Sequence, residues 1–295
     1  MKQEEKAQRQ FNQQAERFAT WEVTGNEVNL GRFSSFCELR AEDTVLDVAC
    51  GTGNMVIYCA PSVASVDGVD IAERMIALAE AEAQQRQVGN VRFSVGPVEH
   101  LPYPDGGHTL VMCRAAFHHF SDPRRVLDEM LRCCHSGGRL SVQDIVAYGE
   151  PDIDAYVEEP ERAIDNSHSR TLRRDEFTDL FAQAGIAGVH GVEFHIRLDL
   201  VNYVGHAVQS NDMGRETDNL IERGLKDSRL STVFQQHDGR LYLLRNVLFL
   251  GGRKDDAMLP LEGTRRPPRI VRLDLTGPAW DRVPEKRDGP ANATT

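Results

Sequence analysis

The stretch 45–54 constrains the fold more than any other part of the chain, because in it a short apolar run enters a turn with two glycines. Gly51 and Gly53 stand one residue apart, and an apolar pattern with helical spacing begins directly after them. A strand, a tight turn and a helix N-terminus in this order present free backbone N–H groups at the carboxyl edge of a parallel sheet. The stretch therefore predicts a site for an adenosine-containing cofactor, and residues elsewhere decide which one.

The composition narrows the class of protein. The chain has 295 residues, of which 40% are hydrophobic, and a formal net charge of −11. This charge disfavours general attraction to nucleic acid or to anionic membranes. No apolar run reaches the roughly 18–20 residues that span a bilayer, and the charged start lacks the apolar segment of a secretory signal. We therefore expect a cytoplasmic protein with no nucleic-acid partner, no membrane span and, because its six cysteines form no Cys-x-x-Cys pair, no metal site.

The hydrophobic pattern alternates between strand-like and helix-like segments. This alternation predicts an α/β fold, Rossmann-like, with a seven-stranded, mostly parallel sheet and helices on both faces. The expected strands are 44–49, 63–69, 91–95, 109–113, 139–146, 189–198 and 240–251. The expected helices are 1–20, 27–38, 54–60, 72–87, 123–134, 173–184 and a long helical region at 200–226.

A few sequence features distinguish among the cofactors that contain adenosine. A dinucleotide site requires a small residue three positions after the second glycine, and Val56 stands there. No Lys-Ser/Thr pair follows the glycines, which excludes a nucleoside-triphosphate loop. Asp70, at the end of the second expected strand, lies where a carboxylate accepts hydrogen bonds from both ribose hydroxyls.

Several segments in order resemble the class I S-adenosylmethionine-dependent methyltransferases. The matching segments are 45–53, 69–75, 98–105, 117–123 and 137–140. Within that family, the chain is most similar to the small-molecule group that includes the ubiquinone and menaquinone biosynthesis C-methyltransferases. The resemblance covers residues 43–147 and continues more weakly to 253.

The resemblance implies which residues bind S-adenosylmethionine. Asp47, Ala49 and the turn Gly51, Thr52 and Gly53 would face the methionine end, Asp70 the ribose, Ile71 the adenine, and Val98 or Glu99 the adenine edge. The chain departs from the family at Pro97, where an acidic residue is common, and at His108-Thr109, where an aromatic residue and Asp are usual. Both departures bear on the affinity for the cofactor.

Three polar side chains follow the fourth expected strand. Arg114 emerges at the carboxyl edge, where it either touches a ligand or pairs with a neighbouring acid. His118 and His119 come next, and we expect one to face the acceptor pocket and the other to pack. His119 is a candidate general base, although the pattern favours structural packing or hydrogen bonding for it. Methyl transfer from a sulfonium needs alignment more than acid–base help, and a base matters only if the acceptor must lose a proton.

The resemblance also implies an organisation of the chain. Residues 1–40 would form lid helices that include Phe11, Phe18 and Trp21, and residues 41–253 the cofactor-binding domain. Within it, residues 150–226 would cap the acceptor side. The stretch 150–170 is acidic and irregular, and its His168 and Arg170 either cover the acceptor or belong to a surface loop. The tail 254–295 is expected to be disordered, although 269–275 alternates like a strand and could join a sheet edge.

These observations predict methyl transfer from S-adenosylmethionine to a small organic acceptor at carbon, oxygen, nitrogen or sulfur, with S-adenosylhomocysteine as the second product. Two alternatives remain at this stage. The first is an enzyme that uses the same cofactor for a cyclisation or elimination. The second is a non-catalytic sensor or partner protein. We expect a monomer or a homodimer.

Overall fold

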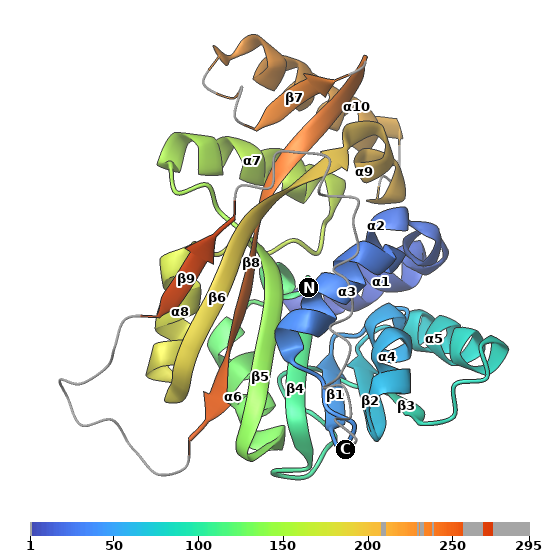
Figure 1. Cartoon of the computed structure of the whole chain (residues 1–295). Coiled ribbons are helices and arrows are strands. Elements are labelled where there is room, and N and C mark those ends of the chain that lie inside the picture. Colours follow the sequence, from blue (N-terminus) through green and yellow to red (C-terminus); the bar gives the residue numbers. More distant parts are fainter. Residues whose placement is uncertain are drawn as a thin grey trace, which may run out of the picture.

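The computed structural model describes residues 2–207, 211–228, 230, 233–237, 239–255 and 268–273. In this part of the chain the strands form one mixed sheet, with the order β3-β2-β1-β4-β5-β8-β6-β9 and with β7 paired to β8 (Figure 1). The strands are β1 (Thr44–Val48), β2 (Ser65–Asp70), β3 (Val91–Val95), β4 (His108–Arg114), β5 (Cys134–Val146), β6 (Ile186–Asp199), β7 (Phe234–His237), β8 (Arg240–Lys254) and β9 (Arg269–Arg272).

The first five strands are parallel, and their carboxyl ends define one edge of the sheet. β1 lies between β2 and β4, with Val48 opposite both Val69 and Cys113. β8 runs antiparallel to both β5 and β6. The Rossmann-like architecture with a mostly parallel sheet is confirmed, and all seven expected strands are present. β7 is an additional strand, too short to stand out in the sequence, and β9 lies in the segment 269–275 whose alternation indicates an edge strand.

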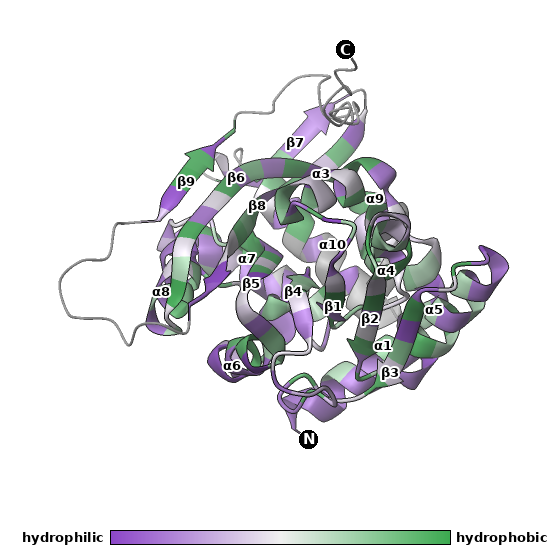
Figure 2. Cartoon of the chain, turned by 60° about the horizontal axis from the view of Figure 1, so that its bottom comes forward, coloured by the Kyte–Doolittle hydropathy of each residue, from purple (hydrophilic) through white to green (hydrophobic). Residues whose placement is uncertain are grey.

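Helices cover both faces of the sheet and bury a separate apolar cluster on each. α3 (Glu27–Cys37) and α4 (Asn54–Cys59) pack on one face, and α6 (Pro123–Cys133) and α8 (Arg174–Gln183) on the other. Phe33 of α3 and Phe181 of α8 are fully buried, which stabilises the fold by about 1.5–3 kcal/mol for each side chain. Figure 2 shows hydrophobic residues along the central strands and hydrophilic ones on the outer helices α5 (Glu73–Gln85) and α6.

The N-terminal helices lie at the carboxyl edge of the sheet. α1 (Gln3–Thr20) contacts α5 on one side and α9 (Leu200–Ala207) on the other. α2 (Glu22–Gly25) follows it and leads into α3. Among the residues that the structure describes, no helix is long and apolar enough to cross a membrane.

The expectation of an irregular stretch at 150–170 is wrong for its first part. Residues Pro151–Ile164 form the helix α7, with Pro151 in its first turn. Ile153, Val157 and Ile164 are buried, and their spacing matches one face of a helix. The acidic residues between them obscured this pattern in the sequence.

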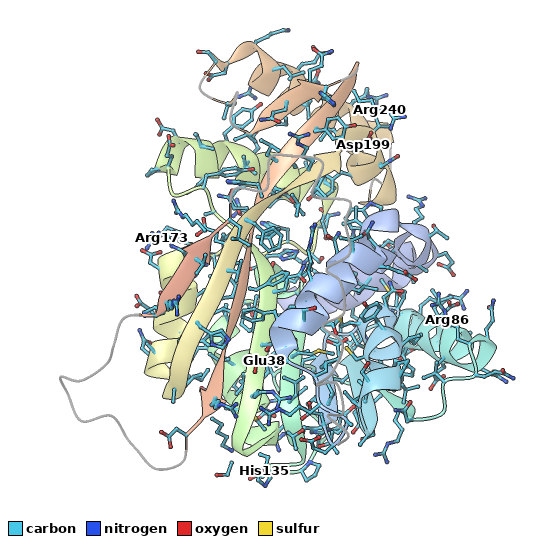
Figure 3. The ribbon with its side chains drawn as sticks, viewed as in Figure 1. Glu38, Arg86, His135, Arg173, Asp199 and Arg240 are labelled. Carbon is cyan, nitrogen blue, oxygen red and sulfur yellow. The ribbon has the colours of Figure 1, made fainter. Side chains whose placement is uncertain are left out.

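The distal halves of β6 and β8 project beyond the parallel strands and carry a third apolar cluster with α7, α9 and α10 (Asn211–Lys226). The single helical region expected at 200–226 is two helices, and residues 208–210 between them lie outside the described part. Figure 3 shows Asp199 and Arg240 near each other at the end of this projection, where their charged groups are 3.8 Å apart.

One segment of the expected disordered tail is ordered. β9 pairs in parallel with β6, with Ile270 opposite Gly191, and Ile270 packs against the main core. The Arg272 side chain lies 3.4 Å from a carboxylate oxygen of Glu193. Residues 256–267 and 274–295 lie outside the described part.

Gly53 connects the turn after β1 to the packing of α5 and β3. Its φ is +75°, and a Cβ at this position would lie 2.8 Å from the Cβ of Ala79 and 2.9 Å from Cε1 of Phe93. We expect Gly53→Ala to lower the free energy of unfolding by about 2–4 kcal/mol, because backbone strain and overpacking add. Urea unfolding measures this loss. Gly89→Ala is the matched control, since a Cβ at Gly89 meets nothing within 4 Å, and an equal effect of both variants would contradict the packing argument.

Candidate functional site

A cavity of about 220 Å³ lies at the carboxyl ends of the parallel strands, beneath α1. One water molecule needs only ~10–15 Å³, so the cavity has room for a sizeable ligand. The sequence-predicted residues that line it are Asp47, Ala49, Gly51, Thr52, Asp70, Ile71, Val98, Glu99, Arg114, His118 and His119. Gly53 is the exception, since it packs against Ala79 and Phe93 instead of lining the cavity.

Asp70 fixes the shape of the turn after β1. Its Oδ2 accepts a 2.9 Å hydrogen bond from Gly51 N, and its Oδ1 accepts one of the same length from Ala72 N. Burial raises the pKa of Asp70, and these backbone bonds oppose the rise. Both oxygens retain a lone pair, and the side chain lines the cavity.

Gly51 leaves open space in the same turn. Its φ is +55°, and a Cβ there would meet only Phe18 Cε1, at 3.5 Å. The preceding Ala49 also has a positive φ, of 58°. Two left-handed residues fold the backbone back on itself at the sheet edge, and a ligand can approach the main chain closely there.

Asp47 presents an unsatisfied carboxylate oxygen to the cavity. The side chain is 2% exposed, and its Oδ1 has no hydrogen-bond partner among the described residues. Burial raises the pKa of Asp47 to about 7, against the opposing charge of Arg114. The Arg114 guanidinium also donates a 2.8 Å hydrogen bond to Thr24 O in α2. A buried acceptor without a donor indicates a place for a ligand N–H group.

The two departures from the family pattern lie at different places. Pro97 does not line the cavity, whereas its neighbours Val98 and Glu99 do, and Glu99 Oε2 has no partner among the described residues. His108 and Thr109 lie at the opposite end of β4, where His108 Nε2 is 2.9 Å from Asp67 Oδ2. The second departure therefore acts on packing at the opposite end of the sheet from the cavity, which neither His108 nor Thr109 lines.

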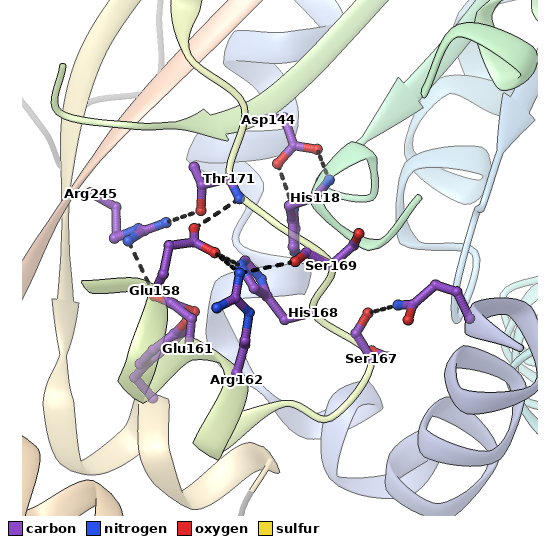
Figure 4. Close-up of polar contacts among 12 residues, drawn as sticks. His118, Asp144, Glu158, Glu161, Arg162, Ser167, His168, Ser169, Thr171 and Arg245 are labelled. Carbon is purple, nitrogen blue, oxygen red and sulfur yellow. Dashed lines mark hydrogen bonds and ion pairs between the residues drawn. The ribbon is translucent and has the colours of Figure 1, made fainter. Parts of the chain in front are cut away.

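His118 is paired with a buried carboxylate on the neighbouring strand. Its Nδ1 lies 2.6 Å from Oδ1 of Asp144, a β5 residue that is 1% exposed. Both residues belong to the cavity wall (Figure 4 shows the pair). Burial acts to lower the pKa of His118, but the Asp144 carboxylate outweighs it, so the pKa lies above 6.5. Nε2 has no hydrogen-bond partner among the described residues.

His119 has a different environment, although its ring centroid is only 4.1 Å from that of His118. Its Nδ1 lies 3.1 Å from Ser167 Oγ, and Phe11 of α1 packs edge-on against the ring. Burial and the neighbouring His118 hold the pKa of His119 well below its ordinary value. His119 is therefore neutral and packed, whereas His118 is the stronger base.

The two remaining candidate residues of this region, His168 and Arg170, lie in different environments. His168 lines the cavity, and its Nε2 lies 3.1 Å from Glu158 Oε2 (Figure 4). Arg170 is exposed and pairs with Glu176 at 3.0 Å, so it belongs to the surface.

A buried polar group that the sequence analysis missed lies farther along β8. Arg245 is 1% exposed, its Nη1 is 3.2 Å from Glu161 Oε1, and its Nη2 donates to Thr171 Oγ1 at 3.4 Å. The Tyr203 hydroxyl donates to the second carboxylate oxygen of Glu161. The sequence feature that could have indicated this buried group is a charged residue inside the apolar run 241–250. Asp144 interrupts the apolar pattern of β5 in the same way.

α1 and the residue that follows it cover the cavity with aromatic side chains. Phe11 and Phe18 of α1 and the next residue, Trp21, all line it, and their successive ring centroids lie 6.1 and 6.0 Å apart. The amide of Gln3 donates to Ser167 O at 2.5 Å, and that of Gln8 donates to Ile71 O at 3.3 Å. α1 is thus attached to both ends of the cavity.

Comparisons with known proteins agree with this geometry. Residues 46–142 match the family described as "Methyltransferase domain". The uncharacterized methyltransferase YcgJ of Bacillus subtilis is 34% identical over 177 residues, which cover 60% of this chain and 70% of YcgJ. Its crystal structure aligns with a TM-score of 0.72 and 25% identity over 79% of this chain and all of YcgJ. Demethylmenaquinone methyltransferase of Deinococcus radiodurans is 41% identical over 99 residues, 32% of this chain and 40% of that protein.

The buried carboxyl group of Asp47 makes a testable contribution to stability in the ligand-free protein. The folded protein keeps a proton, with a pKa of about 7, that an unfolded aspartate with a pKa of 3.8 releases. Stability therefore falls as the pH rises from about 4 to 7. Asp47→Asn removes this dependence, so its stability relative to the wild type should rise across the interval, by as much as roughly 4 kcal/mol. Urea unfolding at several pH values measures the effect, and parallel pH curves for the two proteins would contradict it.

Proposed function

The chain belongs to the S-adenosylmethionine-dependent methyltransferases, and from that premise we propose that it transfers a methyl group to an acidic O–H of a small organic acceptor, with His118 as the general base. The family is supported by YcgJ, of which this chain covers 70% at 34% identity. The observation that carries the choice of base is the 2.6 Å contact of His118 with Asp144 in the cavity wall.

The residues at the cofactor end fit S-adenosylmethionine. The buried Oδ1 of Asp47 has no hydrogen-bond donor among the described residues, and the ammonium group of the methionine moiety would supply both a donor and an opposite charge. Asp70 retains acceptor capacity for ribose hydroxyls, and Gly51 leaves room for the ligand beside the main chain. When bound, the cofactor supplies an electrophilic methyl group on a sulfonium.

The imidazole of His118 has the arrangement of a general base. Asp144 accepts from Nδ1, which fixes the tautomer that leaves Nε2 with a lone pair toward the cavity. Nε2 of His118 would accept the proton of the acceptor hydroxyl as the acceptor oxygen takes up the methyl group that the bound cofactor would supply. The residues around this position come from α1, η2 (Phe117–His119) and α7.

A small organic acceptor fits the cavity better than a macromolecule does. Aromatic side chains of α1 cover it, and the walls are largely apolar. The net charge of −11 offers no attraction to nucleic acid.

Asp70→Asn tests the cofactor site. We expect the affinity for S-adenosylhomocysteine to fall at least tenfold, because charge-assisted hydrogen bonds to the ligand and to Gly51 N are lost. Isothermal calorimetry measures this. Asp67→Asn, three residues earlier on β2 and directed to His108, should bind like the wild type. No heat from the wild type with either S-adenosylmethionine or S-adenosylhomocysteine would overturn the proposed function.

Substitution of His118 tests the base. With a hydroxyl acceptor found by a mass-spectrometric screen for a gain of one methyl group, His118→Gln should lower kcat by about 10²–10⁴. Its affinity for S-adenosylhomocysteine should be unchanged. His135→Gln, at an exposed histidine at the other end of the sheet (Figure 3), is the control. A product with a rearranged skeleton and no added methyl group would instead favour a cyclisation or elimination.

The same pair predicts the pH profile. Only the neutral imidazole accepts a proton, and the pKa of His118 lies above 6.5. The rate should therefore rise with pH through a value above 6.5. Asp144→Asn removes the carboxylate that raises this pKa, so the rising limb should move to lower pH while the maximum rate falls. An unshifted limb in Asp144→Asn would exclude the dyad.

A further inference from the structure

The acceptor side of the cavity has a wall of apolar side chains that comes from one face of three strands. Val247 of β8 lies opposite both Ile145 of β5 and Phe194 of β6. Phe249, Ile196 and Leu198 continue the same faces, because alternate residues of a strand point to one side. All six side chains line the cavity. A polar acceptor would lose hydration against this wall without compensation.

Arg245 interrupts this apolar face at its distal end. Arg245 precedes Val247 by two residues and Phe249 by four, so it shares their side of β8, and it lies opposite Ile196. The guanidinium is 99% buried, lines the cavity, and leaves Nε without a hydrogen-bond partner among the described residues. A buried N–H without an acceptor is costly, and a ligand oxygen would satisfy it.

The charged groups around Arg245 determine whether a neutral or a negatively charged ligand oxygen would bind there. Glu161 is 3.2 Å away and neutralises the guanidinium (Figure 4). Glu158 adds a second negative charge nearby. A ligand carboxylate would therefore meet repulsion, whereas a neutral carbonyl or ether oxygen would meet the Nε donor without that repulsion.

The register places this donor at a distance from the proposed base. Asp144, which holds His118, lies opposite Leu248, three residues from Arg245 along β8. At about 3.3 Å per residue the backbone positions of Arg245 and Leu248 are roughly 10 Å apart along β8. Alternation turns the Asp144 side chain to the other face of β5 from Ile145 and the apolar wall, and the cavity, which both His118 and Arg245 line, connects the two polar groups.

From this arrangement we infer that the acceptor is an uncharged, elongated and largely apolar molecule that carries a neutral hydrogen-bond-accepting oxygen at Arg245, roughly 10 Å from the hydroxyl that is methylated. The inference rests on the proposed function, since it takes the His118 end as the reacting end. It assigns to Arg245 the selection of the acceptor.

Three synthetic phenols test this assignment on the full-length protein saturated with S-adenosylhomocysteine. The first is a para-alkylphenol, the second carries a chain ketone about 10 Å from the hydroxyl, and the third carries a carboxylate in place of the ketone. We expect calorimetry to show the ketone binding about 5–10-fold tighter than the alkylphenol, the gain of one hydrogen bond, and the carboxylate binding weakest.

Variants assign the preference to residues. Arg245→Met alone leaves the Glu161 charge unpaired and can unfold the protein, so Arg245→Met is combined with Glu161→Gln. The double variant should bind the ketone and the alkylphenol equally. Glu161→Gln alone should raise the affinity for the carboxylate relative to the ketone. Arg197→Met, an exposed arginine on the adjacent strand with its side chain on the opposite face from Ile196 and Leu198, should keep the wild-type order.

Each remaining outcome overturns the inference. Equal affinities in the wild type, a ketone preference that survives in the double variant, tightest binding of the carboxylate, or no binding of any of the phenols would each do so. Binding of S-adenosylhomocysteine is measured in the same samples, and its loss would count against the proposed function instead. The two claims can therefore fail separately.

Discussion

The shape of the site depends on one carboxylate, Asp70, which bonds to the backbone of the turns that follow β1 and β2. β1 and β2 are parallel neighbours, so their carboxyl ends lie side by side, and each continues into a turn with unpaired N–H groups. Asp70 accepts from Gly51 N after the first strand and from Ala72 N after the second. This bridge sets the curvature of the glycine turn. It also fixes the floor of the cavity, from which Asp47 presents its free oxygen.

The features that the sequence predicts well are those set by local chemistry. The glycine turn, the strand before it and the acid at the end of the next strand each have a local signature, and the parallel sheet places them together. The contacts of His118 and Arg245 are of another kind. Alternation indicates that residue 144 lies on a strand and that residue 245 interrupts an apolar run, but their partners come from elements far away in the chain.

The expectations that differ from the structure have physical causes. Acidic residues hid the apolar face of α7, which only three buried side chains define. The alternation at 269–275 indicates an edge strand within the tail, and β9 forms there, but its partner β6 and the ion pair of Arg272 with Glu193 are contacts that a local pattern does not reveal. Of the two histidines, His119 is a candidate base for which packing is the favoured expectation. Its contacts agree with packing, because Phe11 and Ser167 enclose His119 while Asp144 pairs with His118.

The attachment of α1 has a kinetic consequence. Gln8 ties the helix to Ile71 beside the cofactor residues, and Gln3 ties it to Ser167 beside the acceptor residues. A rigid helix cannot release one of these contacts widely without straining the other. Displacement of α1 would therefore uncover both ends of the cavity together, and wherever such an opening is slower than the chemical step it would limit turnover.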